Sequence, residues 1–190
     1  MNVLFIYPNI NTPYSFSPAI QQLSAVLKKA DHETSLIHIN NEHGIPFEKA
    51  DILEEYVKIE ADIVCITATT FEFKEANEIA KMIRSCSCKF IILGGTHATI
   101  CPEDLKGSHF DAFCIGEGEL PLLELIDKIS KYQDFTDIKS FWFNHPTDGK
   151  NFDKILKIDS DLSEQLEKKN IPHYKYFNDN TYYFQLKCRQ

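Results

Sequence analysis

Short apolar runs alternate with amphipathic stretches over residues 1–131, and this alternation limits the possible folds more than any other feature. The runs are rich in Val, Ile and Phe and are mostly continuous, as is typical of strands that are buried on both faces. They are Val3–Tyr7, Thr34–Ile39, Asp62–Thr67, Lys89–Leu93 and Ala112–Ile115. Five buried strands are therefore predicted.

Between these runs, apolar residues recur at helical spacing. The spacing predicts helices around Ile20–Ala30, Ala76–Ile83 and Leu122–Ile129, and more weakly over Glu48–Ile59. Regular alternation of strands and helices indicates an α/β fold: a doubly wound, five-stranded parallel sheet with helices on both faces. Among Rossmann-like arrangements, the flavodoxin-like strand order 2-1-3-4-5 suits five strands best.

The pattern changes after residue 131, which divides the chain into a predicted Rossmann-like domain over 1–131 and an added region over 132–190. A strand over Ile138–Asn144 and a return strand near Asn151–Lys157 predict a hairpin. The segment Pro172–Gln190 is an aromatic-rich tail without clear periodicity. We expect the natural protein to continue beyond this tail.

Composition excludes several classes of protein. The 190 residues carry a net charge of −8 and a sequence pI near 5.3, and there is no basic stripe of the kind that nucleic-acid binders usually carry. No apolar run approaches the roughly 20 residues of a membrane span. The six cysteines have no C-x-x-C spacing, and Cys65 and Cys114 lie inside apolar runs. We therefore expect reduced thiols, a cytoplasmic location, and neither nucleic acid nor membrane as a partner.

Ligands of open parallel α/β sheets bind beyond the carboxyl ends of the strands. Four predicted loops follow such ends, and they supply the candidate ligand-binding residues. These are Pro8 and Asn9 after the first strand, Thr67, Ala68, Thr69 and Thr70 after the third, Gly94, Gly95, Thr96 and His97 after the fourth, and Gly116, Glu117 and Gly118 after the fifth.

These loops offer uncharged hydrogen-bonding groups, namely hydroxyls and accessible backbone. Four of the seven glycines lie in the last two loops, and the threonines, together with Thr99, offer uncharged hydrogen bonds. The loops contain no Lys or Arg, so the ligand should carry few negative charges. Because glycine allows close backbone approach, we expect Gly94 and Gly95 to matter for ligand access rather than for the fold.

Familiar nucleotide and hydrolase motifs are missing. There is no G-x-x-x-x-G-K-[ST], no G-x-G-x-x-G after the first strand and no G-x-S-x-G. The loops also lack a nucleophile–base pair, so we expect no catalysis by this domain alone.

Several segments together resemble a known family. They are NVLFIYPN, LSAVLKKADHETSLI, DIVCITATT, ILGGTHATICPEDL and FDAFCIGEGELPLLELI, and they cover about residues 1–130. In order and spacing they are similar to the N-terminal cobalamin (B12)-binding domain of cobalamin-dependent radical SAM proteins, such as the anaerobic magnesium-protoporphyrin IX monomethyl ester cyclase. The resemblance implies a domain that binds cobalamin and presents it to a radical SAM domain of the same protein. It further implies that this parent enzyme uses a [4Fe–4S] cluster and S-adenosylmethionine.

The sequence departs from the wider family in its cobalt ligand. The D-x-H-x-x-G motif of that family supplies a histidine from the loop after the first strand, whereas Pro8–Pro18 contains none. We therefore expect base-off, His-off cobalamin, no metal-ligating residue in this chain, and His97 near the rim of the site. The remaining histidines, His38 among them, are predicted to be surface residues or local partners. Cys188 is the first member of a cluster motif or lies just upstream of one.

Two hypotheses from other classes stay open beside this one. The first is a flavodoxin-like or receiver-like electron-transfer or interaction domain without cobalamin, and the second is an interaction domain with an empty pocket. The long proline-rich first loop and the GG and GEGE segments favour cobalamin over flavin mononucleotide.

Overall fold

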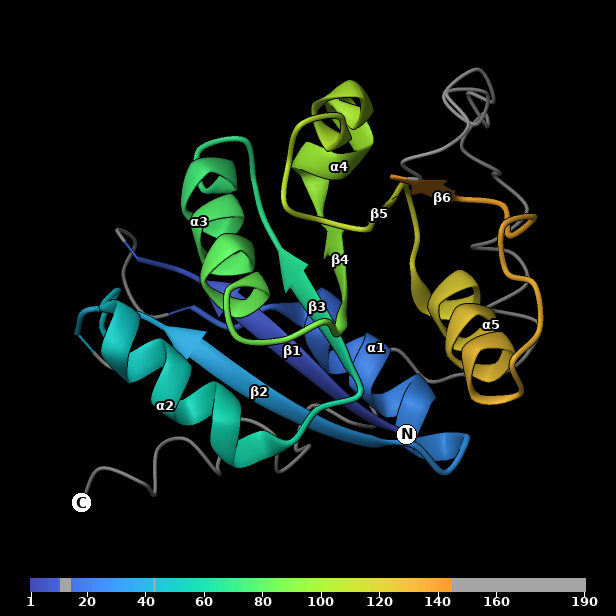
Figure 1. The fold of residues 1–190 in the computed structure, drawn as a ribbon, viewed down its shortest axis with the longest axis horizontal. Coiled ribbons are helices and arrows are strands. Elements are labelled where there is room, and N and C mark those ends of the chain that lie inside the picture. Colours follow the sequence, from blue (N-terminus) through green and yellow to red (C-terminus); the bar gives the residue numbers. More distant parts are fainter. Residues whose placement is uncertain (11–14, 43, 145–190) are drawn as a thin grey trace.

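Each predicted apolar run forms a strand. The computed structural model describes residues 1–10, 15–42 and 44–144. Its first five strands are β1 (Asn2–Pro8), β2 (Glu33–Ile39), β3 (Ile63–Thr67), β4 (Phe90–Gly94) and β5 (Ala112–Cys114). They are parallel and stand in the order β2-β1-β3-β4-β5, which confirms the predicted order (Figure 1).

The sheet has a sixth strand, so the prediction of five was one short. β6 (Phe141–Phe143) falls within the predicted strand Ile138–Asn144, but it pairs antiparallel with β5, with Cys114 opposite Phe141. The hairpin hypothesis paired this strand with a return strand, whereas in the structure it pairs with the edge of β5. That return strand and the tail lie outside the described residues.

Four amphipathic helices cover the sheet, two on each face. They are α1 (Pro18–Lys29), α2 (Lys49–Ile59), α3 (Phe73–Arg84) and α5 (Glu119–Ser130). α2 and α3 lie side by side on one face, and α1 and α5 on the other (Figure 1). The sequence at the start of α1 explains why the helix begins there. Ser17 Oγ accepts a hydrogen bond from the Ile20 N–H, and proline fills the first helical position.

Two apolar cores result, one on each face of the sheet. Successive residues of β1 alternate between them: Leu4 and Ile6 pack towards α2 and α3, while Val3 and Phe5 pack towards α1 and α5. All four side chains are at most 2% exposed. Burial on both faces explains why the runs are continuously apolar, and it confirms the doubly wound class.

The segment after β4 forms two short helical turns that the sequence did not predict. α4 (Thr96–Ile100) is an α-helix, and the 3-10 helix η1 (Pro102–Leu105) follows it. Five residues are too few to display an amphipathic period, so this segment was interpreted as a loop. Its helical course turns the chain back over the end of the sheet, and this turn positions the candidate site.

The burial of two cysteines and one histidine can be compared with the sequence predictions. Cys65 and Cys114 are buried free thiols, as predicted, and burial raises the pKa of Cys114 to about 12, with further contributions from Glu119 and Glu117. His38, in contrast, was predicted at the surface or beside a local partner; it is 3% exposed and stacks on Tyr7. Burial lowers the pKa of His38 to about 4.

Within the described parts of the chain, no helix combines the length and apolar character that crossing a membrane requires.

Candidate functional site

The four predicted loops start at one end of the sheet, which we call the carboxyl edge: the end where β1, β3, β4 and β5 stop. The strand register fixes this alignment, because Ile6 pairs with Ile66, Thr67 with Gly94 and Leu93 with Phe113. Residues that follow these pairs in each strand therefore emerge together. α4 lies beyond the end of β4 on this side of the molecule (Figure 1).

The thirteen predicted site residues divide by exposure. Exposed or half-buried at the carboxyl edge are Thr67, Thr69, Thr70, Gly94, Gly95, Thr96, Gly116, Glu117 and Gly118. Buried are Pro8, Asn9, Ala68 and His97. The first group can reach a ligand directly, whereas the second supports the edge from behind.

Gly95 packs against the chain itself. It has a φ of +96°, and a Cβ built on it would lie 2.7 Å from the Ala68 carbonyl oxygen. Backbone hydrogen bonds hold this contact, because the Ala68 N–H donates to Gly94 O at 3.1 Å and the His97 N–H donates to Ala68 O at 3.2 Å. The expectation that Gly95 does not matter for the fold is therefore wrong, whereas its contact with a ligand stays a prediction.

Gly94 differs from its neighbour. A Cβ on Gly94 would meet no atom of the described structure within 4 Å. The missing side chain leaves open space at the end of β4, beside Thr67 of β3. At this point of the carboxyl edge, the described structure leaves the backbone of β4 open to approach.

Thr99 ties the two glycine loops together. The Gly116 N–H donates to Thr99 Oγ1 at 2.9 Å, and the Thr99 hydroxyl donates to Gly95 O at 3.3 Å. Gly116 adopts a φ of +76°, a conformation that favours glycine. The hydroxyl of Thr99 thus acts within the protein, while its neighbour Thr96 is exposed.

The loop after β3 presents two hydroxyl residues to solvent. Thr69 donates to Glu72 Oε2 through both its N–H and its hydroxyl, at 3.0 and 2.9 Å, which fixes the start of α3. Thr69 and Thr70 are exposed, and Thr67 is half-buried. These threonines are neutral donors and acceptors at the centre of the edge.

Asn9 is a structural residue of the first loop. Its N–H donates to Ile39 O at 2.9 Å, its carbonyl accepts from Asn40 Nδ2 at 2.7 Å, and its side chain donates to Ser15 Oγ at 3.2 Å. Only 1% of Asn9 is exposed. These bonds join β1 to β2 and hold the point at which the long first loop leaves the sheet.

The start of α5 is tightly packed. A Cβ on Gly118 would lie 3.3 Å from Leu23 Cδ2 and 3.5 Å from Cys114 Sγ, so glycine lets α1 approach the end of β5. Glu119, in the first turn of α5, is 5% exposed, whereas Glu117 is exposed. The sequence did not identify Glu119 as a buried acid, although its place at a helix N-terminus favours a negative charge.

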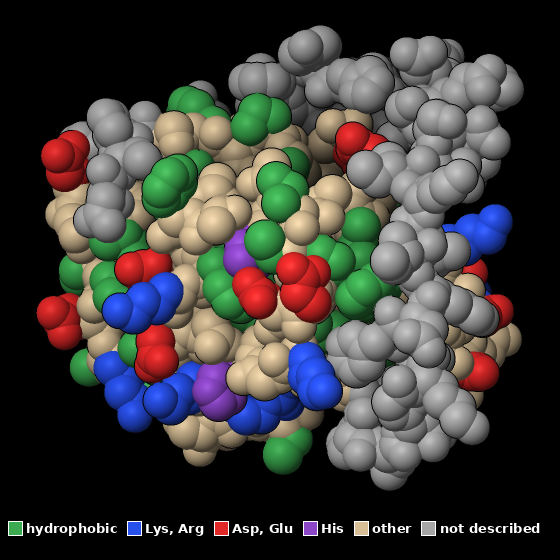
Figure 2. Space-filling view, turned by 90° about the horizontal axis from the view of Figure 1, so that it is seen from above, with side chains coloured by type: hydrophobic (Ala, Val, Ile, Leu, Met, Phe, Trp, Pro, Cys, Tyr) green, Lys and Arg blue, Asp and Glu red, His purple; other side chains and the backbone are tan. Residues whose placement is uncertain are grey.

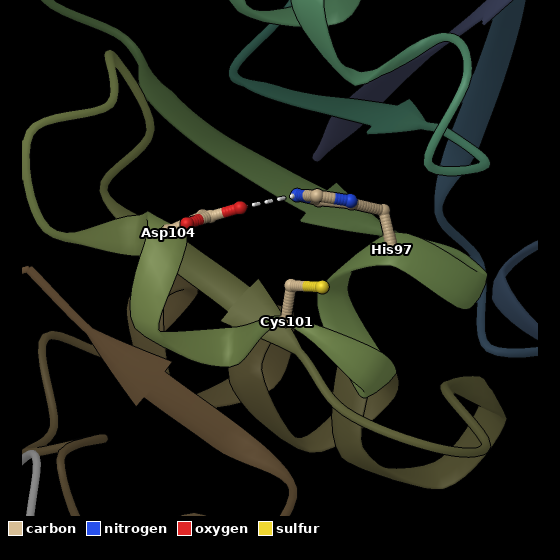
Figure 3. Close-up of side chains that lie close together, drawn as sticks. All are labelled: His97, Cys101 and Asp104. Atoms are coloured by element: carbon tan, nitrogen blue, oxygen red, sulfur yellow. Dashed lines mark ion pairs between the residues drawn. The ribbon is translucent and has the colours of Figure 1, made fainter.

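His97 is not at the rim of the site. It is 2% exposed, its ring stacks on Phe73 with centroids 3.8 Å apart, and the edge of Phe113 packs against it. Nδ1 lies 3.5 Å from Thr70 Oγ1, and Nε2 lies 3.3 Å from Asp104 Oδ2 (Figure 3). The prediction of a rim position failed because the sequence could not show that α4 turns the ring inward.

Large apolar side chains are exposed around the same edge. Phe71 is 96% exposed, Ile100 68% and Phe16 48%, and each follows the carboxyl end of a strand. Figure 2, which views the molecule from the side of α4, shows hydrophobic side chains spread over this face, with acidic side chains among them near the centre. The edge can therefore accept a large, mostly uncharged ligand surface.

The comparison with protein families assigns the chain to a family. The model of the B12 binding domain family matches residues 14–126. The match includes α1 and the loops after β3, β4 and β5, three of the four loops at the carboxyl edge. The chain belongs to the B12-binding domain family. This membership favours the cobalamin hypothesis over the flavodoxin-like or receiver-like alternative.

A curated protein is similar to part of the chain. The uncharacterized methyltransferase PH0819 of Pyrococcus horikoshii is 37% identical over 92 residues, which are 47% of this chain and 20% of that protein. The chain thus spans a fifth of the length of the curated relative that it matches.

Solved structures show the same fold. The radical S-adenosylmethionine methyltransferase TsrM from Kitasatospora setae, solved with cobalamin and a [4Fe-4S] cluster, superposes with a TM-score of 0.66 at 20% identity, over 76% of this chain and 27% of that one. The apo form of the cobalamin-dependent S-adenosylmethionine radical enzyme OxsB gives 0.63 at 19% identity, over 76% and 21%. Both are similar to this chain over part of their length only.

Proposed function

We propose that this chain holds cobalamin at the carboxyl edge with the benzimidazole base off the cobalt and no histidine in its place, and presents the corrin to a radical SAM domain. The observation that carries the proposal is the open space at Gly94, flanked by the threonines that follow β3. A corrin ring needs such a flat, side-chain-free approach to the backbone.

The donor groups of the edge suit cobalamin. Its corrin carries many neutral amide groups and the molecule contains a single phosphate, so hydroxyls and backbone N–H groups are apt partners. Thr67, Thr69, Thr70 and Thr96 supply hydroxyls, and the four loops contain no Lys or Arg. We assign the direct contacts to these threonines and to Gly94, and the fit is chemical as well as spatial.

The last two glycines of the edge are assigned to the nucleotide tail. Gly116 and Gly118 flank Glu117 at the start of α5, where a Cβ on Gly118 would lie 3.3 Å from Leu23 Cδ2. Helix N-termini offer free N–H groups that suit a phosphate. A tail bound along the exposed side of these loops would keep the base away from cobalt.

The positions of the histidines support the proposed His-off state. The segment Pro8–Pro18 contains no histidine. His97, in the first turn of α4, is buried with Nδ1 towards Thr70 and Nε2 towards Asp104. Neither nitrogen is therefore directed to the open side of Gly94, and water or no ligand occupies the lower face of cobalt in this proposal.

Presentation to a second domain is supported by the exposed apolar residues. Phe71 and Ile100 border the edge and would be covered by a partner that also covers the corrin. Bound cobalamin supplies methyl transfer or electron transfer at cobalt, while the [4Fe–4S] cluster and S-adenosylmethionine belong to the radical SAM domain. The cyclase-like subtype stays a prediction.

Two measurements test this function. Chain incubated with hydroxocobalamin and passed through gel filtration should retain the visible absorption of the cofactor, and Gly94→Leu should retain much less. Electron paramagnetic resonance of the cob(II)alamin form should show no nitrogen superhyperfine splitting. Failure of the parent to retain the cofactor would overturn the binding proposal. Nitrogen splitting would overturn the base-off, His-off state, and its loss in His97→Ala would identify His97 as the ligand.

A further inference from the structure

Three side chains of different donor chemistry meet where α4 passes into η1. His97 lies in the first turn of α4, Cys101 follows its last residue, and Asp104 lies in η1. The imidazole nitrogen, the thiol sulfur and a carboxylate oxygen all lie within 4.8 Å of one another. In Figure 3 the three side chains point towards a common space.

The ring plane of His97 is fixed and its second nitrogen faces a hydrogen-bonding group, as is usual for a metal-binding imidazole. Stacking on Phe73 fixes the ring plane. Nδ1 lies 3.5 Å from Thr70 Oγ1, and donation of the Nδ1 proton to this hydroxyl leaves the lone pair on Nε2. Among the described residues, Nε2 has no hydrogen-bond partner of good geometry, although it is buried.

The separation of two donor atoms matches a tetrahedral site. Nε2 of His97 and Oδ2 of Asp104 are 3.3 Å apart. Two ligands about 2.0–2.2 Å from a tetrahedral Zn²⁺ are separated by about 3.4 Å. Cys101 is half-buried and Asp104 is about half exposed, and the Cys101 sulfur lies within 4.8 Å of both other donor atoms.

We propose that His97, Cys101 and Asp104 bind a divalent transition-metal ion of the Zn²⁺ type, with water as the fourth ligand. Neutral imidazole, thiolate and carboxylate together carry two negative charges, which balance the ion. Binding replaces the S–H bond of Cys101 with a sulfur–metal bond and releases that proton to solvent.

The backbone already brings the ligands together. The Cys101 N–H donates to His97 O at 2.8 Å, and the Asp104 N–H donates to Cys101 O at 3.2 Å. The spacing of four and then three residues places successive ligands on one side of the α4–η1 turn. A bound ion therefore clamps this turn and stabilises the segment that follows the Gly94–Gly95 pair.

The experiment uses the full 190-residue chain, purified without cobalamin, stripped with a chelator and titrated with Co²⁺ as a spectroscopic probe for the Zn²⁺ site. The background variant carries Cys86→Ser, Cys88→Ser and Cys188→Ser, so that other thiols do not contribute. We expect one Co²⁺ per chain, a thiolate-to-cobalt charge-transfer band, and displacement of Co²⁺ by Zn²⁺.

The variants change Cys101 and Asp104, because His97 packs in the core. Cys101→Ser should abolish the charge-transfer band, and Asp104→Asn should weaken Co²⁺ binding at least about tenfold. Glu103→Gln, a neighbouring exposed acid, is the matched control and should bind like the parent. Zn²⁺ should also raise the melting temperature of the parent and less so that of Cys101→Ser. Absence of the band in the parent, or an unchanged band in Cys101→Ser, overturns the proposal, and it does so whether or not the chain binds cobalamin.

Discussion

The carbonyl oxygen of Ala68 leaves no room for a side chain on Gly95, because a Cβ atom there would lie only 2.7 Å from this oxygen. The same Cβ would lie 2.8 Å from Thr67 Oγ1. Gly95 also adopts φ +96° and ψ −174°, a region of backbone conformation that is almost restricted to glycine. The junction between β4 and α4 therefore depends on glycine for the fold itself.

Substituting Gly95 should destabilise the protein. In Gly95→Ala, the backbone strain and the contact with Ala68 together should lower the free energy of unfolding by about 2 kcal/mol or more. Urea denaturation measures this loss. Gly94→Ala is the matched control and should leave the free energy almost unchanged, because its Cβ meets nothing. Equal stabilities of the two variants would contradict the difference between these adjacent glycines.

A larger side chain at Gly94 should affect the ligand instead of the fold. Valine and leucine at this position extend into the open space beside Thr67, where we place the corrin. Gly94→Leu should weaken cobalamin binding by more than about tenfold, or roughly 1.4 kcal/mol, with an unchanged urea midpoint. Binding titration of Gly94→Ala, →Val and →Leu should show a graded loss. An affinity independent of side-chain size would remove Gly94 from the site.

The sheet could be predicted from the sequence because its signal is local. A strand that is buried on both faces must be apolar throughout, as in Ile63–Thr67, and the number and order of such runs leave few arrangements. The same reasoning located the carboxyl edge, since each loop follows the end of a predicted strand. These features depend on neighbouring residues along the chain.

The features that the sequence missed depend on residues far apart. β6 pairs with the open edge of β5, and no local sequence pattern indicates this pairing. Burial of Asn9 depends on Asn40, and burial of His97 depends on Phe73 and on the turn of α4. The spacing His97-x-x-x-Cys101-x-x-Asp104 was the one available signal for the side-chain cluster, and it becomes meaningful only when that turn is helical.

Stability should fall in mild acid because of His38. Burial lowers the pKa of His38 from 6.5 to about 4 in the folded state. Between these values the unfolded chain binds a proton that the folded chain does not, so the free energy of unfolding decreases as the pH falls from about 6.5 to 4. The total loss should approach about 3 kcal/mol. Above pH 6.5 the group makes no pH-dependent contribution.

Urea denaturation at several pH values isolates this effect. His38→Phe keeps a flat ring against Tyr7 but cannot bind a proton, so its stability should depend less on pH between 4 and 6.5. His109→Gln, which changes a histidine outside the core, is the matched control. If His38→Phe and the parent have the same slope over this range, His38 is not the group responsible.

We expect Asp111 to stabilise the fold, because it links three elements near the β5 side of the sheet. Its Oδ2 atom accepts hydrogen bonds from the Ile91 N–H at 2.7 Å and from the Arg84 guanidinium, while its backbone carbonyl accepts from the Asn144 N–H. One residue therefore connects β4, the end of α3 and the segment after β6. Loss of the carboxylate leaves the Ile91 N–H without its acceptor, and Ile91 is fully buried.

We therefore expect Asp111→Ala to lower the free energy of unfolding by about 2 kcal/mol, because an unsatisfied buried donor costs more than a lost surface contact. Asp111→Asn keeps an acceptor for the Ile91 N–H, so it should lose about half as much. Glu54→Gln breaks an exposed ion pair with Lys58 and should have no measurable effect in the same urea titration. If Asp111→Ala were as stable as Glu54→Gln, the bond to Ile91 would contribute nothing to the fold. A loss in Asp111→Asn equal to that in Asp111→Ala would instead assign the stabilisation to the charge that faces Arg84.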